Sequence, residues 1–283
     1  DLRELFKSWF NPGFLKLAKI TWDTKAAVLE KIMKYERVHE IKDMDELKRR
    51  LGEDRRFFSY FHPALEDEPI IFVQVALTNG LGKSIQEITK PRTEGDKNYD
   101  SATFYSISNC QEGLSRVTLG NFLIKRVVFE IQEELPNIKN FGTLSPIPGF
   151  RDWFSYLEDN KIKNIIGNIP IENIKFLKSP DLKPGDPRIV SNKDALLKLV
   201  SHYLINEKNH KKLPVNDVCR FHLGNGAIID DIIINANVSE VGLNRSFGVM
   251  VNYLYELKNI EKNHEDYINN KKVIVSDKVK KLI

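Results

Sequence analysis

The spacing of apolar residues changes period along the chain, and these changes predict its elements. Residues 70–78 (IIFVQVALT) form an apolar, β-branched run between Pro69 and a turn signal at Gly80, which is typical of a buried strand. Residues 101–108 (SATFYSIS) alternate enough to predict a second strand. In residues 122–135 apolar side chains recur at spacings of three and four, which predicts a helix with one buried face.

The first part of the chain predicts helices in pieces, at residues 2–10, 25–39 and 44–51. Asp23 and Thr24 offer a cap to the second piece, and Asp43 offers one to the third. The third piece and the residues after it are basic, and a solvated face is a better interpretation of them than phosphate contacts. These basic residues are Lys48, Arg49, Arg50, Arg55 and Arg56.

Residues 104–150 predict the order strand, polar turn, long helix, short strand and proline-fixed turn. A helix that opens just after Gly120 and Asn121 would present free backbone N–H groups and the positive end of its dipole to an anion such as a pyrophosphate. Ser145 follows the short strand, in a turn that Pro146 and Pro148 fix. The unit therefore resembles a phosphate cradle followed by a rigid corner.

The last part of the chain begins with a polar region at 151–216, rich in Lys and Asn, which we interpret as an insertion or lid. Residues 221–238 return to strand character, and helices at 249–267 and 275–283 close the chain. His222 lies at the predicted strand–loop junction.

Composition narrows the functional classes. The chain has 283 residues, 41% hydrophobic and 29% charged, as in an ordinary globular protein. A net charge of +4 gives no nucleic-acid footprint. Two cysteines argue against a disulfide scaffold or a cysteine-rich zinc site and favour a reducing compartment, and the histidines lack zinc-site spacing. No run of 18 apolar residues predicts a membrane span.

Spacing alone leaves the chemistry open. Ser145 has no G-x-S-x-G elbow, and a serine before proline is commonly a turn former. The turn at 110–121 is neither a Walker loop nor G-x-G-x-x-G. His222 is either structural or functional; Gly224 and Gly226 leave room for a ligand near it, and Asn225 adds an amide.

Six strings together resemble the malonyl-CoA decarboxylase family, in the same order and at similar separations. They are HPALEDEPIIFVQVAL, FYSISNCQEGL, GNFLIKRVV, TLSPIPGF, FHLGNGA and MVNYLY. The resemblance extends from about Ser8 to Val279 and is weakest at 151–216. It implies an α+β fold like that of the GCN5-related N-acetyltransferases, a bent mixed sheet flanked by helices. Residues 1–55 would be a helical segment and linker, and residues 56–283 the catalytic domain with its insertion.

The resemblance also assigns the site. The family's catalytic serine, histidine and a nearby tyrosine carry over to Ser145, His222 and Tyr255. The coenzyme A (CoA) contacts would come from Gln111, Gly113, Leu119, Gly120, Asn121 and Asn225. We expect His222, as an acid of near-neutral pKa, to protonate the carbanion that CO₂ leaves behind, while Ser145 hydrogen-bonds the malonyl carboxylate or the enolate.

The family reaction converts malonyl-CoA to acetyl-CoA and CO₂ without a metal, biotin or another cofactor. An N-acyltransferase on the same fold and a non-catalytic acyl-CoA-binding relative are the alternatives, the latter because the chain departs from family patterns at residues 231–237. We expect a homo-oligomer in the cytoplasm, or in mitochondria if a targeting segment has been removed, with no nucleic-acid or membrane partner.

Overall fold

The computed structural model describes residues 10, 12–90, 98–111, 113 and 120–283, and of residues 120–123 it describes the backbone only. The chain divides into two compact units. Unit 1 is Asp1–Gly82 with Ile88–Phe141, and unit 2 is Lys83–Glu87 with Gly142–Ile283. None of the described helices is both long and apolar enough to cross a membrane.

Unit 1 is built on four antiparallel strands in the order β1 to β4. These are β1 (Lys16–Lys19), β2 (Arg55–Phe61), β3 (Pro69–Thr78) and β4 (Ser101–Asn109). Every β3 residue except the last is buried, as its continuous apolar run predicts. The strands predicted at 70–78 and 101–108 are therefore confirmed.

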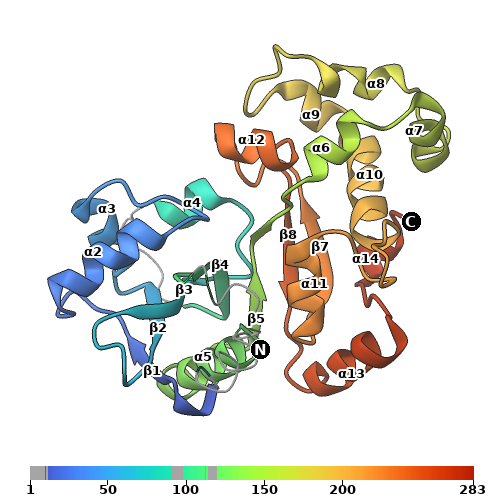
Figure 1. Cartoon of the computed structure of the whole chain (residues 1–283). Coiled ribbons are helices and arrows are strands. Elements are labelled where there is room, and N and C mark those ends of the chain that lie inside the picture. The colour runs from blue at the N-terminus through green and yellow to red at the C-terminus, as the bar shows by residue number, and fades with distance from the viewer. Residues whose placement is uncertain (1–9, 11, 91–97, 112, 114–119) are drawn as a thin grey trace. The chain divides into compact units, whose positions relative to one another are not determined.

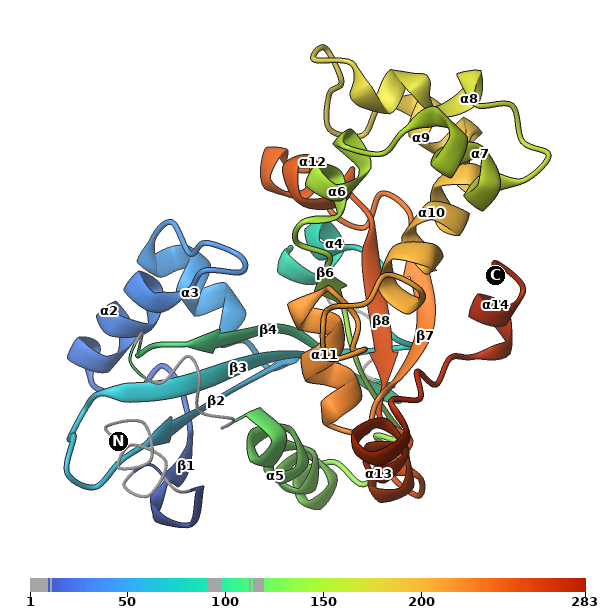
Figure 2. The same cartoon turned by 45° about the vertical axis from the view of Figure 1, so that its right-hand side comes forward.

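Helices cover both faces of this sheet (Figure 2). On one face lie α2 (Ala26–Tyr35) and α3 (Met44–Arg50), whose apolar side chains form a core with Phe57 and Phe72. The other face carries α5 (Gly120–Glu134). The described residues of unit 1 also include a 3₁₀ turn η1 (Pro12–Phe14) and part of the short helix α4 (Ile85–Thr89), whose first three residues belong to unit 2.

The helices predicted within the described residues of unit 1 are confirmed as α2, α3 and α5, but one expected cap is wrong. Asp43 caps α3, accepting from the Glu46 N–H at 2.7 Å, but α2 starts at Ala26 without a side-chain cap, so the cap expected from Asp23 and Thr24 is wrong. The piece predicted at 2–10 lies almost wholly outside the described residues. The predicted boundary near residue 55 does not separate the core, since α2 and α3 pack on strand side chains.

The basic residues after Lys48 are not all on a solvated face. Arg50 is buried, donates to the carbonyls of His39 and Glu40 at 2.7 and 2.8 Å, and pairs with Glu46. Arg55 is also buried. These guanidinium groups therefore satisfy backbone carbonyls inside unit 1, which the charge pattern alone did not indicate.

Unit 2 is organised around β8 (Met250–Leu254), which pairs antiparallel with three strands. They are β7 (Ile228–Ile233), β6 (Ser145–Pro146) and, through the pair Gly142 and Leu254, β5 (Asn140–Thr143). Figure 1 shows α11 (Asp217–Gly224) beside the β7–β8 pair. The helical region after β6 comprises α6 (Phe150–Ser155), α7 (Asp159–Ile166), α8 (Glu172–Lys175), η3 (Phe176–Lys178), α9 (Pro187–Ser191) and α10 (Lys193–Ile205). The remaining helices are α12 (Glu240–Ser246), α13 (Ile260–Asn270) and α14 (Asp277–Lys280).

Two predictions in unit 2 are wrong. Residues 221–224 end a helix instead of opening a strand, and residues 250–254 form a strand where a helix was expected. Residues 250–253 are all buried and β8 pairs with three strands, so tertiary pairing prevails over the apparent helical pattern. The mixed class of strands flanked by helices is confirmed.

Candidate active site

Ser145 stands at the start of β6, two residues beyond Thr143, the end of β5. It pairs in register with Val251 of β8, and its side chain is buried, with 6% exposed. Residues two apart on an extended chain point to the same side, so Thr143 and Ser145 share a face. The Ser145 hydroxyl donates to Thr143 Oγ1 at 2.8 Å.

His222 belongs to α11, so it reaches the site from a helix and not from a strand as predicted. Asn216 caps this helix by accepting from the Cys219 N–H at 2.9 Å. The helix ends before Gly226, whose positive φ and closeness to the Ile260 carbonyl leave no space for a Cβ. A helical signal was present, because the buried Cys219, His222 and Leu223 are spaced by three and four.

The structure brings Ser145, His222 and Tyr255 together through hydrogen bonds. His222 Nε2 lies 3.0 Å from Ser145 Oγ, and His222 Nδ1 lies 2.8 Å from the Tyr255 hydroxyl, just beyond the end of β8. His222 and Tyr255 are 3% and 2% exposed. The three residues that the family resemblance assigned to catalysis thus form one buried chain of polar groups.

Burial determines the protonation states of His222 and Tyr255. Desolvation lowers the pKa of His222 from its ordinary 6.5 to about 3, so its imidazole is neutral at physiological pH. The Tyr253 ring stacks on it at 4.5 Å between centroids, which contributes to the dry surroundings. Burial raises the pKa of Tyr255 well above 10, so its hydroxyl keeps its proton. The expectation of a histidine acid with near-neutral pKa is therefore wrong.

Three polar residues that the motifs did not single out support the site: Thr143, Asn216 and Asn252. The Asn252 amide donates to the Thr143 carbonyl at 2.7 Å, and the Tyr253 N–H donates to Thr143 Oγ1 at 3.3 Å. Asn216, besides capping α11, donates through Nδ2 to the Pro148 carbonyl at 2.8 Å. This residue therefore connects the helix of His222 to the turn after Ser145. Alternation along residues 141–145 is the signal that would have found Thr143.

The residues predicted to bind CoA belong mostly to unit 1. Gln111 is half-buried and donates to Glu68 and to the Pro69 carbonyl at 3.0 and 3.2 Å. Gly113 is exposed, and α5 begins at Gly120, two residues before the start predicted at residue 122. Leu119 lies outside the described residues.

Asn225, the remaining predicted CoA contact, ends α11 in unit 2. Its Nδ2 donates to the Phe221 carbonyl at 2.7 Å, whereas its buried Oδ1 has no hydrogen-bond partner among the described residues. Its backbone N–H donates to the His222 carbonyl at 3.0 Å as the helix ends, but no side-chain hydrogen bond among the described residues links Asn225 to the Ser145 hydroxyl or the His222 imidazole. Its role in binding CoA stays a prediction.

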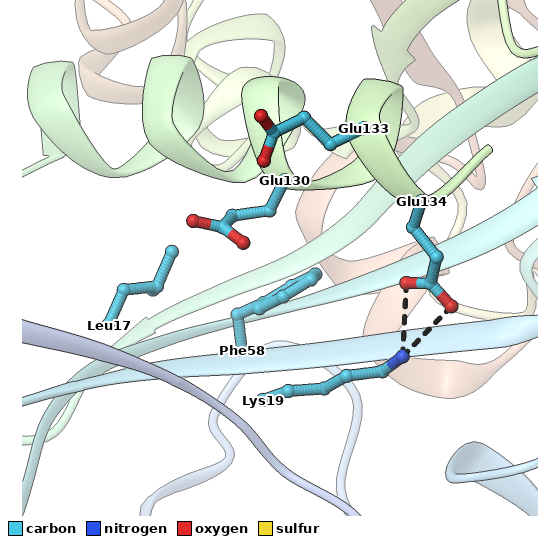
Figure 3. A pocket seen from close by; sticks show the side chains of 6 residues that line it. All are labelled: Leu17, Lys19, Phe58, Glu130, Glu133 and Glu134. Carbon is cyan, nitrogen blue, oxygen red and sulfur yellow. Dashed lines mark hydrogen bonds and ion pairs between the residues drawn. The ribbon is translucent and has the colours of Figure 1, made fainter. Parts of the chain in front are cut away.

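A pocket in unit 1 lies between α5 and the strands β1 and β2 (Figure 3). It is lined by Leu17, Lys19, Phe58, Glu130, Glu133 and Glu134. Lys19 is held by Glu134 in an ion pair of 3.0 Å. The pocket is lined by three glutamates, whose negative charges would repel the phosphates of CoA, so it is a poor candidate for binding them. Across the described residues, no group of three or more His, Cys, Asp or Glu could hold a metal ion.

Comparison with known proteins gives a family match over almost the whole chain. The model of the malonyl-CoA decarboxylase C-terminal domain matches residues 13–283. The mitochondrial malonyl-CoA decarboxylase of Mus musculus is 37% identical over all of this chain. The chain spans 62% of that relative's length.

Solved structures agree with this match. Malonyl-CoA decarboxylase from Rhodopseudomonas palustris superposes with a TM-score of 0.89 at 40% identity, covering 99% of this chain and 69% of that one. The enzyme from Agrobacterium vitis gives 0.89 at 42% identity, covering 99% and 70%. The loading GNATL domain of CurA from Lyngbya majuscula is only 13% identical, with a TM-score of 0.55 over 87% of this chain and 98% of that one. That last similarity supports the fold alone.

Proposed function

The chain belongs to the malonyl-CoA decarboxylase family, and from this premise we propose that it is a carboxy-lyase that converts malonyl-CoA to acetyl-CoA and CO₂ at Ser145, His222 and Tyr255. The observation that carries the proposal is the buried hydrogen bond of 3.0 Å between Ser145 Oγ and His222 Nε2. That bond joins two residues, from two of the family motifs, that lie 77 positions apart in the sequence (222 − 145).

The reaction asks the site for two things. Breaking the bond between the carboxylate and C2 leaves its electron pair on an enolate, with negative charge largely on the thioester oxygen. A dry site favours loss of the carboxylate, and a preorganised donor stabilises the oxygen by about 3 kcal/mol, roughly a hundredfold in rate. The Ser145 hydroxyl is the donor we assign, because it is buried and held by two polar neighbours.

Protonation of the enolate carbon completes the reaction. With a pKa of about 3, His222 has no imidazolium proton to give at neutral pH. We assign the proton to the Ser145 hydroxyl, which His222 replenishes from Nε2 while it takes the Tyr255 proton at Nδ1. The enolate of a thioester is a strong base, so neutral donors suffice. A water molecule gives its proton to Tyr255 in the same relay, so no tyrosinate is left in the dry site, and the hydroxide that remains is neutralised by the buffer or by the released CO₂.

The CoA part of the substrate is assigned to residues 111–121, which lead into α5. Gly120 and Asn121 open a helix of 15 residues, long enough to present the positive end of its dipole to a pyrophosphate. Gln111 and Gly113 precede it, with Leu119 in the same turn by sequence. Asn225 is the remaining CoA contact that the family resemblance implies. Replacing Asn121 by Asp should raise the KM for malonyl-CoA and leave kcat less affected.

The proposed reaction needs no metal or organic cofactor, because CoA is part of the substrate. Dialysis of the purified chain against EDTA should leave the rate of acetyl-CoA formation unchanged. A loss that added Mg²⁺ or Zn²⁺ restores would contradict this part of the proposal.

Incubation with malonyl-CoA separates the proposed function from its alternatives. Mass spectrometry should show acetyl-CoA formed in proportion to enzyme, with and without an added amine. Acyl transfer to the amine would indicate an N-acyltransferase instead. Binding of malonyl-CoA without either product would indicate a non-catalytic acyl-CoA-binding protein.

Assembly and location are also proposals. We propose a homo-oligomer, to be tested by light scattering coupled to size exclusion, where a single-chain mass would contradict it. For the compartment we propose the cytoplasm, with mitochondria as the alternative because the Mus musculus relative is named mitochondrial. Buried, unbridged Cys110 and Cys219 are in keeping with a reducing compartment. Cell fractionation with an antibody distinguishes the two locations.

A further inference from the structure

Thr143 occupies a particular place in the polar chain of unit 2. Its Oγ1 accepts two hydrogen bonds, from the Ser145 hydroxyl at 2.8 Å and from the Tyr253 N–H at 3.3 Å. Its carbonyl accepts from Asn252 at 2.7 Å, and the residue is 1% exposed. Thr143 is therefore held through both its backbone carbonyl and its side-chain oxygen, which fixes the place of Oγ1 beside Ser145.

The direction of the hydrogen bond from Ser145 to Thr143 determines the directions of the two hydrogen bonds that His222 makes. A serine hydroxyl has one proton. Because Ser145 gives that proton to Thr143, its oxygen must accept at the 3.0 Å contact with His222 Nε2, which therefore carries the imidazole proton. A neutral histidine has only one N–H, so Nδ1 accepts from the Tyr255 hydroxyl at 2.8 Å.

We propose that Thr143 is a positioning residue that fixes the direction of this chain and so holds His222 in its Nε2–H tautomer. The proposal rests on the proposed decarboxylase function and deepens it. Every O–H and N–H from Tyr255 to Ser145 points toward Thr143. When a thioester oxygen takes the place of Thr143 as acceptor, only the Ser145 hydroxyl has to turn. The donor and the proton relay are therefore ready before the substrate arrives.

Two substitutions separate positioning from packing. Thr143→Val keeps the shape but removes the acceptor, and Thr143→Ser keeps the acceptor but removes the methyl group. With Thr143→Val we expect the Ser145 hydroxyl to turn to His222 Nε2 and the imidazole proton to move to Nδ1. The kcat for acetyl-CoA formation should fall at least about tenfold with little change in KM. Thr143→Ser should restore both the tautomer and the rate.

The tautomer is read by ¹⁵N NMR of histidine-labelled protein without malonyl-CoA, with the His222 signals assigned by their absence in His222→Asn. This measurement does not depend on activity. The tautomer can therefore differ from the proposal in an active decarboxylase, and it can agree with the proposal in a protein that forms no acetyl-CoA. The parent chain should show a protonated Nε2 and a bare Nδ1. An Nδ1–H tautomer in the parent would overturn the proposal. So would a Thr143→Val protein with unchanged tautomer and rate, or a Thr143→Ser protein more impaired than Thr143→Val.

Discussion

At the scale of single residues, the environment of His222 determines what it can do. The sequence motif identifies the histidine, but its charge depends on α11 packing it against Tyr253 and Tyr255, which no local pattern reveals. Burial lowers its pKa to about 3, so it acts as a neutral donor and acceptor. The catalytic role of His222 stays a prediction, and the near-neutral pKa expected for it is wrong.

The Tyr255 hydroxyl should matter through His222. Tyr255→Phe removes the partner of Nδ1 and leaves that nitrogen buried and unpaired, at a cost of about 1–3 kcal/mol in the free energy of unfolding. We expect kcat to fall by roughly one order of magnitude or more, since the relay loses its proton source. Tyr156→Phe, at a residue 87% exposed, is the control and should change neither quantity. Equal behaviour of the two variants would contradict the assigned role.

At the scale of elements, β8 and α11 together create the site. Strand signals in residues 70–78 and 101–108 were strong because these strands are buried over almost their whole length. Residues 221–224 were assigned to a strand because they run directly into the apolar strand residues after them, although they end a helix of only eight residues. Residues 250–254 were assigned to a helix because an apolar strand cannot be told from a buried helix by periodicity alone.

Asn216 should couple the helix of His222 to the turn after Ser145. Asn216→Ala removes the cap of α11 and the bond to the Pro148 carbonyl, and we expect the free energy of unfolding to fall by about 1–2 kcal/mol. Asn216→Ser keeps a capping oxygen but is too short to reach Pro148. It should retain most of the stability and still lose activity. If the serine variant were fully active, the connection to Pro148 would have no part in positioning Ser145.

At the scale of the whole molecule, the chain holds two compact units that each bury their own apolar residues. The family resemblance implied the mixed α+β class, whereas the division at residues 82, 88 and 141 follows from long-range packing that the sequence does not display. The three catalytic candidates lie in unit 2, and most of the predicted CoA contacts lie in unit 1.

The buried neutral His222 should make the protein sensitive to acid. Unfolding frees the imidazole to bind a proton below its ordinary pKa of 6.5, while the folded state resists protonation until about pH 3. Between these values the unfolded state binds more protons, so stability falls as pH falls, by up to about 1.4 kcal/mol per pH unit from this group. Urea unfolding followed by tryptophan fluorescence between pH 4 and 7 measures the slope. His222→Asn should lower the slope by this amount, and an identical slope in both proteins would contradict a buried neutral imidazole.

Decarboxylation at Ser145 is tested most directly by kcat/KM for acetyl-CoA formation from malonyl-CoA, measured for the parent chain, Ser145→Ala and Ser191→Ala. Ser191 is an exposed serine on α9, and its substitution should leave the rate unchanged. We predict that the parent forms acetyl-CoA and that Ser145→Ala loses about a hundredfold to a thousandfold, as expected for the removal of one preorganised donor. No acetyl-CoA from the parent, or equal rates from the parent and Ser145→Ala, would contradict the account.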